Sequence, residues 1–217
     1  KDQLNQSEKI TVELGKQTLP VSTTANPLGY LKYTYTASEI QPDMLNADIT
    51  QTTDSPSWGG LYLQYFEKFD QVQQQKGILS VTKKLFIEKI GSDGKQELLP
   101  LGKEKLKTGD KVITRLTLSL KQDMDFLYLK DFRAACFEPI GQLSGNQWKF
   151  GTVYYEESKD AVTNFFFNSL AKGTYVLEYP VWVNQAGTYQ DGIATFQSMY
   201  APEYTAYSEA GKITVTK

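Results

Sequence analysis

The sequence contains no histidine and only one cysteine, and both shortages exclude whole classes of chemistry. Without histidine there is no Ser-His or Cys-His catalytic pair and no zinc site that uses an imidazole. With Cys136 alone, the chain forms no internal disulfide and no multi-cysteine metal site. Because Cys136 lies in the mostly apolar run 133–137, we expect a small buried hydrophobe rather than a reactive thiol. We predict no metal and no cofactor.

An excess of one charge and long apolar runs are also missing. The chain carries 23 Lys and Arg against 25 Asp and Glu, a net charge of −2. A surface that binds phosphate backbones needs a basic excess, so we expect no nucleic-acid partner. No run approaches the ~20 apolar residues of a membrane-spanning helix, so we expect no membrane insertion by this chain. The sequence begins at Lys1 with no signal peptide, and we take it for a piece of a longer protein.

Along most of the chain, apolar residues alternate with polar ones at the period of two that half-buried strands show. In the predicted strand over residues 78–90, for example, Leu79, Val81, Lys83, Leu85 and Ile87 share one face. No stretch has the 3.6-residue period of an amphipathic helix. Strands spaced by turn residues predict an all-β sandwich. We predict strands over residues 9–14, 29–40, 46–52, 58–69, 78–90, 111–120, 125–132, 148–156, 162–168, 175–184, 193–200 and 212–216.

The composition turns polar at residues 71–77, where three consecutive glutamines precede Lys76 and Gly77. We interpret this segment as a domain boundary, with one β-domain in residues 1–70 and a second in residues 71–217. An ordinary loop inside a single domain is the alternative.

Two pairs of carboxylates are candidates for catalysis: Asp123 with Asp125, and Glu156 with Glu157. Paired carboxylates can serve glycoside hydrolysis, which depends on their separation in space. With 25 acidic residues in the chain, such pairs arise by chance, and we interpret both as solvated groups. We expect no enzyme activity.

Aromatic residues support two further interpretations. In the run Phe165 to Phe167, the middle ring must face opposite its neighbours in a strand, which favours core packing and, second, an interdomain contact. Tyr154, Tyr155, Trp58 and Trp182 would form a sugar-stacking platform if they gathered on one face. The alternative function is therefore a carbohydrate-binding or adhesin-type cell-surface sandwich.

Several short stretches between residues 58 and 217 resemble, in order, the carboxy-terminal part of the bacterial alpha-2-macroglobulin family. The residues that carry the resemblance are the runs 62–67, 85–86, 108–110, 130–139, 154–155, 163–167, 170–175 and 199–203. Within these runs the signature positions are Gly109, Asp110, Glu138, Pro139, Gly173, Tyr175, Met199, Tyr200, Ala201, Pro202 and Glu203.

The resemblance implies a large periplasmic or secreted protein, often lipid-anchored at an amino terminus that this sequence lacks. In such a protein a protease cleaves a bait region and is then trapped. Residues 71–217 would be the terminal macroglobulin-type, immunoglobulin-like sandwich, and residues 1–70 the later half of a CUB-like β-domain. The expected partners are other domains of the same chain and, through the full-length protein, target proteases. The family's thioester motif, Cys-Gly-Glu-Gln, does not occur here, so no inhibitory residue is carried over.

If residues 9–70 are half of a sandwich, their sheet lacks partner strands, and open ladder edges invite pairing. We then expect one of three outcomes: a disordered amino-terminal region, strands docked on the terminal sandwich, or a dimer through the exposed sheet edge.

Overall fold

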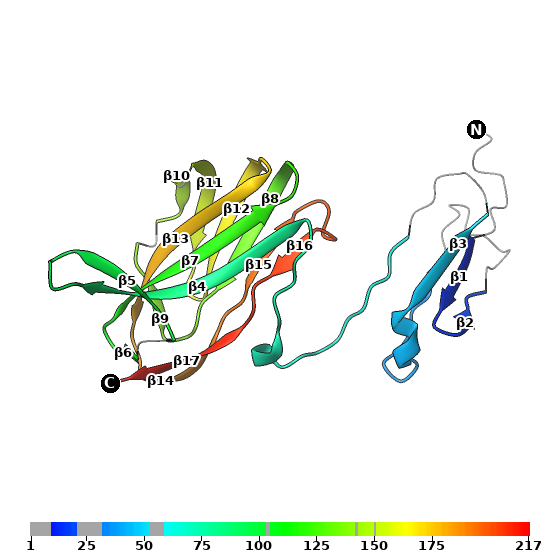
Figure 1. Cartoon of the computed structure of the whole chain (residues 1–217), viewed down its shortest axis with the longest axis horizontal. Coiled ribbons are helices and arrows are strands. Elements are labelled where there is room, and N and C mark those ends of the chain that lie inside the picture. The colour runs from blue at the N-terminus through cyan, green and yellow to red at the C-terminus, as the bar shows by residue number, and fades with distance from the viewer. Residues whose placement is uncertain (1–9, 21–31, 53–58, 103–104, 142, 150) are drawn as a thin grey trace. The chain divides into compact units, whose positions relative to one another are not determined.

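The computed structural model describes residues 10–20, 32–52, 59–102, 105–141, 143–149 and 151–217, with only the backbone at Asp70. The chain forms two compact units, Lys1–Gln64 and Tyr65–Lys217. Almost all regular elements are β-strands (Figure 1), which confirms the predicted all-β fold class. In the described ranges the only helices are two short 3-10 turns, η2 (Pro42–Leu45) and η3 (Phe69–Gln71).

The first unit contains one small antiparallel sheet in the order β2-β1-β3. Its strands are β1 (Ile10–Leu14), β2 (Gln17–Thr18) and β3 (Ala47–Gln51). The turn between β1 and β2 uses Gly15 at φ +62°, a conformation that favours glycine. Leu14 is the only buried residue that the structure describes in this unit, while Ile49 on β3 is 65% exposed. The described part of this unit is therefore an open β-domain with little core of its own.

The second unit is a sandwich of two main antiparallel sheets (Figure 1). The five-stranded sheet has the order β5-β4-β7-β13-β9, and the six-stranded sheet has the order β10-β11-β12-β8-β15-β16. A third, small sheet, β14-β17-β6, contains the parallel pair β17 and β6. The strand bounds are β4 (Leu79–Ile90), β5 (Gln96–Pro100), β6 (Leu106–Lys107), β7 (Lys111–Leu120), β8 (Met124–Phe132), β9 (Phe137–Pro139), β10 (Gly145–Lys149), β11 (Thr152–Ser158), β12 (Val162–Leu170), β13 (Gly173–Val183), β14 (Gly187–Asp191), β15 (Ala194–Ser198), β16 (Thr205–Tyr207) and β17 (Gly211–Thr216).

The core lies between the two main sheets and follows the alternation of the sequence. On β7 every second residue is buried, beginning at Val112 and ending at Leu120. The facing residues Leu127 and Leu129 of β8 have no exposed surface. Burying one such leucine side chain contributes about 1.5–3 kcal/mol, so the inward rows of the two sheets hold the layers together.

The three consecutive phenylalanines lie on β12 and divide between its two faces, as predicted. Phe165 and Phe167 are buried, and each ring centroid lies 5.7 Å from that of Tyr154. Phe166 lies on the outer face, where its ring stacks on that of Tyr128 at a centroid distance of 4.9 Å. Phe165 and Phe167, the first and last rings of the run, therefore pack in the core.

Some strand predictions are wrong. Residues 32–40 and 59–68 form no strand, Phe69 begins η3, and residues 29–31 and 58 lie outside the described residues. The side chains of Tyr62 and Phe66 are 90% and 104% exposed, so their β-propensity finds no sheet to pack against. The predicted strand 148–156 is instead two strands, β10 and β11, joined by a turn at Gly151 with φ +76°. The short strands β2, β5, β6, β9, β14 and β16 were not predicted.

Candidate functional site

The signature run Met199 to Glu203 forms the turn between β15 and β16. Backbone hydrogen bonds close this turn: Ser198 N donates to Tyr204 O at 3.0 Å, and Tyr204 N donates to Ala201 O at 2.9 Å. The Ser198 hydroxyl adds a third bond by accepting from Ala201 N at 3.3 Å. The turn is thus held by its own backbone, and the side chains of Met199 and Tyr200 are left to point outward.

Three apolar side chains gather at this end of the six-stranded sheet: Phe126, Met199 and Tyr200. They are 48%, 50% and 77% exposed. The rings of Phe126 and Tyr200 meet edge to face, with centroids 5.2 Å apart and an interplanar angle of 87°. Met199 N donates to Phe126 O at 2.9 Å, which ties the turn to β8. We call these three residues the signature patch.

Phe126 also has a strained backbone. Its φ is +52°, and it is the only residue other than glycine with positive φ in the described part of the chain. A bulky side chain disfavours this region, and such outliers concentrate at functional sites. The strained residue is thus the one whose ring contacts Tyr200. The signature patch is therefore a specifically built surface feature.

The other signature residues shape turns and strand ends in the second unit. Gly109 has φ +91°, and its N–H donates to Val183 O at 2.8 Å. The Asp110 carboxylate accepts from Lys107 N at 2.7 Å, closing the turn into β7. The Glu138 carboxylate accepts from Asn184 Nδ2 at 2.6 Å, across the pair β9 and β13.

Pro139 pairs with Val181 at the end of β9, and Gly173 begins β13 opposite Leu120. The Tyr175 hydroxyl donates to Ala171 O at 3.0 Å. The contacts of these signature residues are structural, and the assignment of the signature to the family's function stays a prediction.

A buried ion cluster lies between the two main sheets. Lys83 of β4 places its Nζ 2.9 Å from Asp131 Oδ1 of β8 and 3.0 Å from Asp191 Oδ1 of β14. The side chains of Lys83, Asp131 and Asp191 are 3%, 0% and 15% exposed. Lys83 Nζ also donates to Phe132 O at 2.7 Å and to Gly192 O at 2.9 Å. Four oxygen atoms therefore lie within 3.0 Å of Lys83 Nζ.

The neighbours of the cluster set its titration. Burial acts to lower the pKa of Lys83, but Asp131 and then Asp191 outweigh burial and raise it. Burial raises the pKa of Asp191, and Lys83 offsets only part of this effect. The Tyr179 hydroxyl donates to Asp131 Oδ2, and burial followed by Asp131 raises the pKa of Tyr179 far above its ordinary range. The raised pKa of Lys83 keeps its side chain in the ammonium form.

Sequence reasoning placed Lys83 on the inward face of its strand but did not recognise its partners. The sequence did contain a signal for Asp131. This residue shares a strand face with Leu127 and Leu129, just as Lys83 shares one with Val81 and Leu85. A charge in the inward phase of a strand needs an opposite charge to be buried. Asp191 gave no such signal, because β14 was not predicted.

The carboxylate pairs considered for catalysis do not form a catalytic pair. Asp123 directly precedes β8, and its carboxylate accepts from Lys172 N at 2.7 Å, while Asp125 is exposed at the start of β8. On β11, the Glu157 carboxylate accepts from Asn164 Nδ2 at 2.7 Å, and this bond lowers the pKa of Glu157. Burial instead raises the pKa of the neighbouring Glu156. Each group has a structural or solvated role.

Cys136 is fully buried, as predicted, and burial raises the pKa of its thiol to about 11. The thiolate is the reactive form of cysteine. In the folded chain the Cys136 thiol is unreactive for two reasons: reagents cannot reach it, and it stays protonated at neutral pH. We expect a maleimide at neutral pH to leave the folded chain unlabelled and to modify Cys136 fully in guanidinium chloride. Rapid labelling of the folded chain, followed by intact mass, would contradict the buried position.

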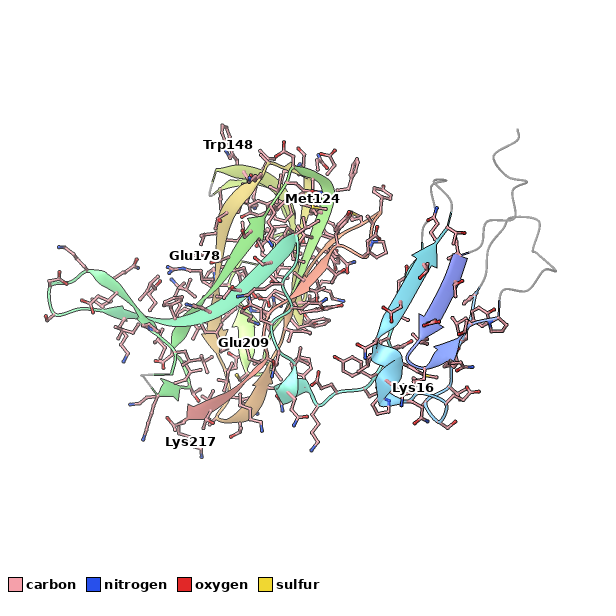
Figure 2. All side chains as sticks on the ribbon, turned by 45° about the vertical axis from the view of Figure 1, so that its right-hand side comes forward. Lys16, Met124, Trp148, Glu178, Glu209 and Lys217 are labelled. Carbon is pink, nitrogen blue, oxygen red and sulfur yellow. The ribbon has the colours of Figure 1, made fainter. Side chains whose placement is uncertain are left out.

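The proposed sugar platform does not assemble. Tyr154 is buried in the core, whereas Trp182 belongs to β13 of the other sheet, and Trp58 lies outside the described residues. Trp148 of β10 projects away from the body of the sandwich (Figure 2) and is 82% exposed. Among the described aromatics named for carbohydrate binding, Tyr154 is buried, and Tyr155 and Trp182 belong to different sheets, so these three form no common platform.

Within the ranges that the structure describes, no group of three or more His, Cys, Asp or Glu side chains is placed to hold a metal ion. The same residues include no helix with the length and hydropathy of a membrane span.

Comparison with protein families gives one match: the bacterial alpha-2-macroglobulin MG10 domain corresponds to residues 79–203. Among solved structures, Salmonella alpha-2-macroglobulin reacted with methylamine has a TM-score of 0.52 at 20% identity, over 67% of this chain and 10% of that one. Native Escherichia coli alpha-2-macroglobulin seen by cryo-EM has a TM-score of 0.51 at 18% identity, over 72% of this chain and 10% of that one.

A shorter Escherichia coli structure, from domain MG7 to the C-terminus, has a TM-score of 0.51 at 18% identity, over 66% of this chain and 24% of that one. At these identities the likeness concerns the fold, and this chain covers only a small part of the solved relatives' length. No curated protein sequence gives a significant match.

Proposed function

Because the chain belongs to the bacterial alpha-2-macroglobulin family, we propose that it is a non-catalytic structural and interaction module of a protease-trapping inhibitor. The observation that carries the proposal is the match of residues 79–203 to the MG10 domain, which covers most of the sandwich. In this proposal the parent protein traps the protease, and the present chain contributes scaffold and contact surface.

The side chains support a non-catalytic role. The sequence has no histidine to act as a general base, and the single thiol is buried and protonated. The carboxylates of the sandwich with shifted pKa values are tied to lysine, asparagine or the core rather than paired across an open cleft. A scaffold needs none of these groups to react.

We assign the signature patch to contact with another domain of the same parent chain. The full-length solved relatives are about ten times as long as the matched region, so a domain of this kind lies beside many others. Exposed Met and aromatic side chains are typical of surfaces that become buried at interfaces. The strained Phe126 holds its ring in position for such a contact.

The open sheet of the first unit is assigned to pairing with strands from elsewhere in the parent protein. On the far side of β3 the structure describes no neighbouring strand. An unpaired ladder next to the exposed Ile49 suits completion of a partial CUB-like domain. Pairing between two copies of the isolated chain is the competing outcome, and it would appear as a dimer in solution.

The parent protein is placed outside the cytoplasm, in the periplasm or secreted, with an amino-terminal lipid as a candidate anchor. This assignment follows from the family, since a trap for foreign proteases has to meet them outside the cell interior.

Trapping has a specific kinetic signature. We expect trypsin, mixed with the full-length protein whose gene contains this sequence, to keep its activity on a small chromogenic peptide and to lose it on a large protein substrate. Enclosure excludes the large substrate but leaves the protease active site free. The isolated 217-residue chain is the matched control, and it should change neither activity.

Two results would refute the trapping function. Equal loss of both activities would mean that the full-length protein blocks the protease active site. Unchanged activities would mean that it does not inhibit trypsin.

A further inference from the structure

The buried ion cluster brings an amine and two carboxylates together across the sandwich. Lys83 lies on β4 of the five-stranded sheet and Asp131 on β8 of the six-stranded sheet. Their side chains are almost completely buried, with Nζ 2.9 Å from Asp131 Oδ1. A second carboxylate, Asp191, lies 3.0 Å from the same nitrogen. Nothing in the scaffold role requires three charges at one point in the core.

We propose that Lys83 and Asp131 condense to form an intramolecular isopeptide bond, with Asp191 as the proton relay. The product is an amide between Lys83 Nζ and Asp131 Cγ that joins the two sheets covalently. This modification site is independent of the function proposed for the parent protein.

The reaction balances with no other reagent. A proton passes from the Lys83 ammonium through the Asp191 carboxyl group to Asp131 Oδ1, so that the neutral amine attacks a neutral carboxyl group at Cγ. A second proton passes from the attacking nitrogen to the same oxygen as the N–C bond forms and the bond from Cγ to Oδ1 breaks. Two of the three ammonium protons leave with this oxygen as water, carried by Asp191, which ends unprotonated. The amide nitrogen keeps one N–H, which still donates to Phe132 O or Gly192 O.

The geometry favours this reaction in three ways. The reacting groups are already in contact, and such proximity is worth an effective concentration of about 10⁵–10⁸ M in well-oriented systems. The Tyr179 hydroxyl donates to Asp131 Oδ2, where negative charge increases during attack. Condensation also removes one positive and one negative charge from a site where burying charge is costly. The ammonium is the resting form, so proton transfer to Asp191 starts the reaction.

Intact-mass spectrometry of the denatured chain tests the proposal. The expected mass is lower than the sequence mass by one water, and tandem spectra of a tryptic digest should show a branched peptide joining Lys83 to Asp131. A full sequence mass would overturn the proposal. So would loss of water located at Asp191-Gly192, because a succinimide at an Asp-Gly step also releases water without involving Lys83.

Three variants separate the bond from a merely structural cluster. Asp131→Asn should lose one ammonia instead of one water, because the leaving group changes. Asp191→Ala should keep the full sequence mass while circular dichroism shows a folded sandwich. Lys84→Arg, at the exposed neighbouring position, should still lose one water. Full mass for Asp131→Asn, or unchanged loss of water in Asp191→Ala, would contradict the assigned roles even if Lys83 variants fail to fold.

Discussion

Replacing Gly192 by alanine is expected to destabilise the sandwich by more than about 4 kcal/mol, or to prevent folding, which is far outside the usual range for one methyl group. A Cβ at this position would lie 2.1 Å from Phe132 O and 2.3 Å from Phe132 C. Both atoms are backbone in β8, next to Asp131, so no side-chain rotation relieves the clash. The shift would also move Gly192 O, which accepts from Lys83.

Guanidinium denaturation followed by circular dichroism measures this effect. Gly211→Ala is the matched control, because no atom lies within 4 Å of a Cβ built at Gly211. We expect this control to change the free energy of unfolding by about 0.5 kcal/mol or less. Equal stability of the two variants would show that the close approach of Gly192 to β8 is wrong.

Lys83→Met is the second large effect, with an expected loss of about 3–5 kcal/mol from the ion cluster alone. The substitution keeps the apolar stem but leaves Asp131 and Asp191 buried together without their cation. Without the ammonium, burial and the neighbouring Asp131, which raise the pKa of Asp191 in the folded state, are no longer opposed by Lys83. Stability is therefore regained as the pH falls through this raised value, and the loss should be largest at neutral pH.

Two controls separate the charge effect from packing. Lys84→Met, at the exposed neighbouring position, should be close to neutral. Counting the ion cluster alone, Asp191→Ala should cost only about 1 kcal/mol, because Lys83 and Asp131 remain as a one-to-one pair, and loss of the proposed isopeptide bond adds to this cost. Burial raises the pKa of Asp191, so its contribution to stability is present below the ordinary value of 3.8 and is lost as the pH rises through the folded-state value. This part of the pH dependence should disappear in Asp191→Ala.

Much of the sandwich could be predicted from the sequence, because a strand that buries one face alternates apolar and polar residues, as β7 does. The run Phe165 to Phe167 was divided correctly between core and surface for the same reason. Periodicity failed where a strand-like composition has no partner. Tyr62 and Phe66 have high β-propensity but remain exposed in an irregular segment, since propensity alone does not supply a neighbouring strand.

Only some residues of the signature patch and of the ion cluster could be predicted from the sequence. The signature run 199–203 was identified from the sequence, but its apolar partner Phe126 was not, because the positive φ of Phe126 and its contact with Tyr200 depend on tertiary structure. The ion cluster joins β4, β8 and β14, which are remote in sequence. Lys83 alone could be recognised as an inward-facing charge, and its two carboxylate partners required the fold.

In the proposed function, the sandwich acts by contact through the signature patch. Hydrogen–deuterium exchange, read by mass spectrometry on the full-length protein and on this chain alone, tests it most directly. We predict that peptides containing Phe126 and residues 199–201 exchange more slowly in the full-length protein. Peptides around Lys95, on the exposed hairpin between β4 and β5, should exchange equally in both. Equal exchange at the signature patch in the two proteins would contradict the claim.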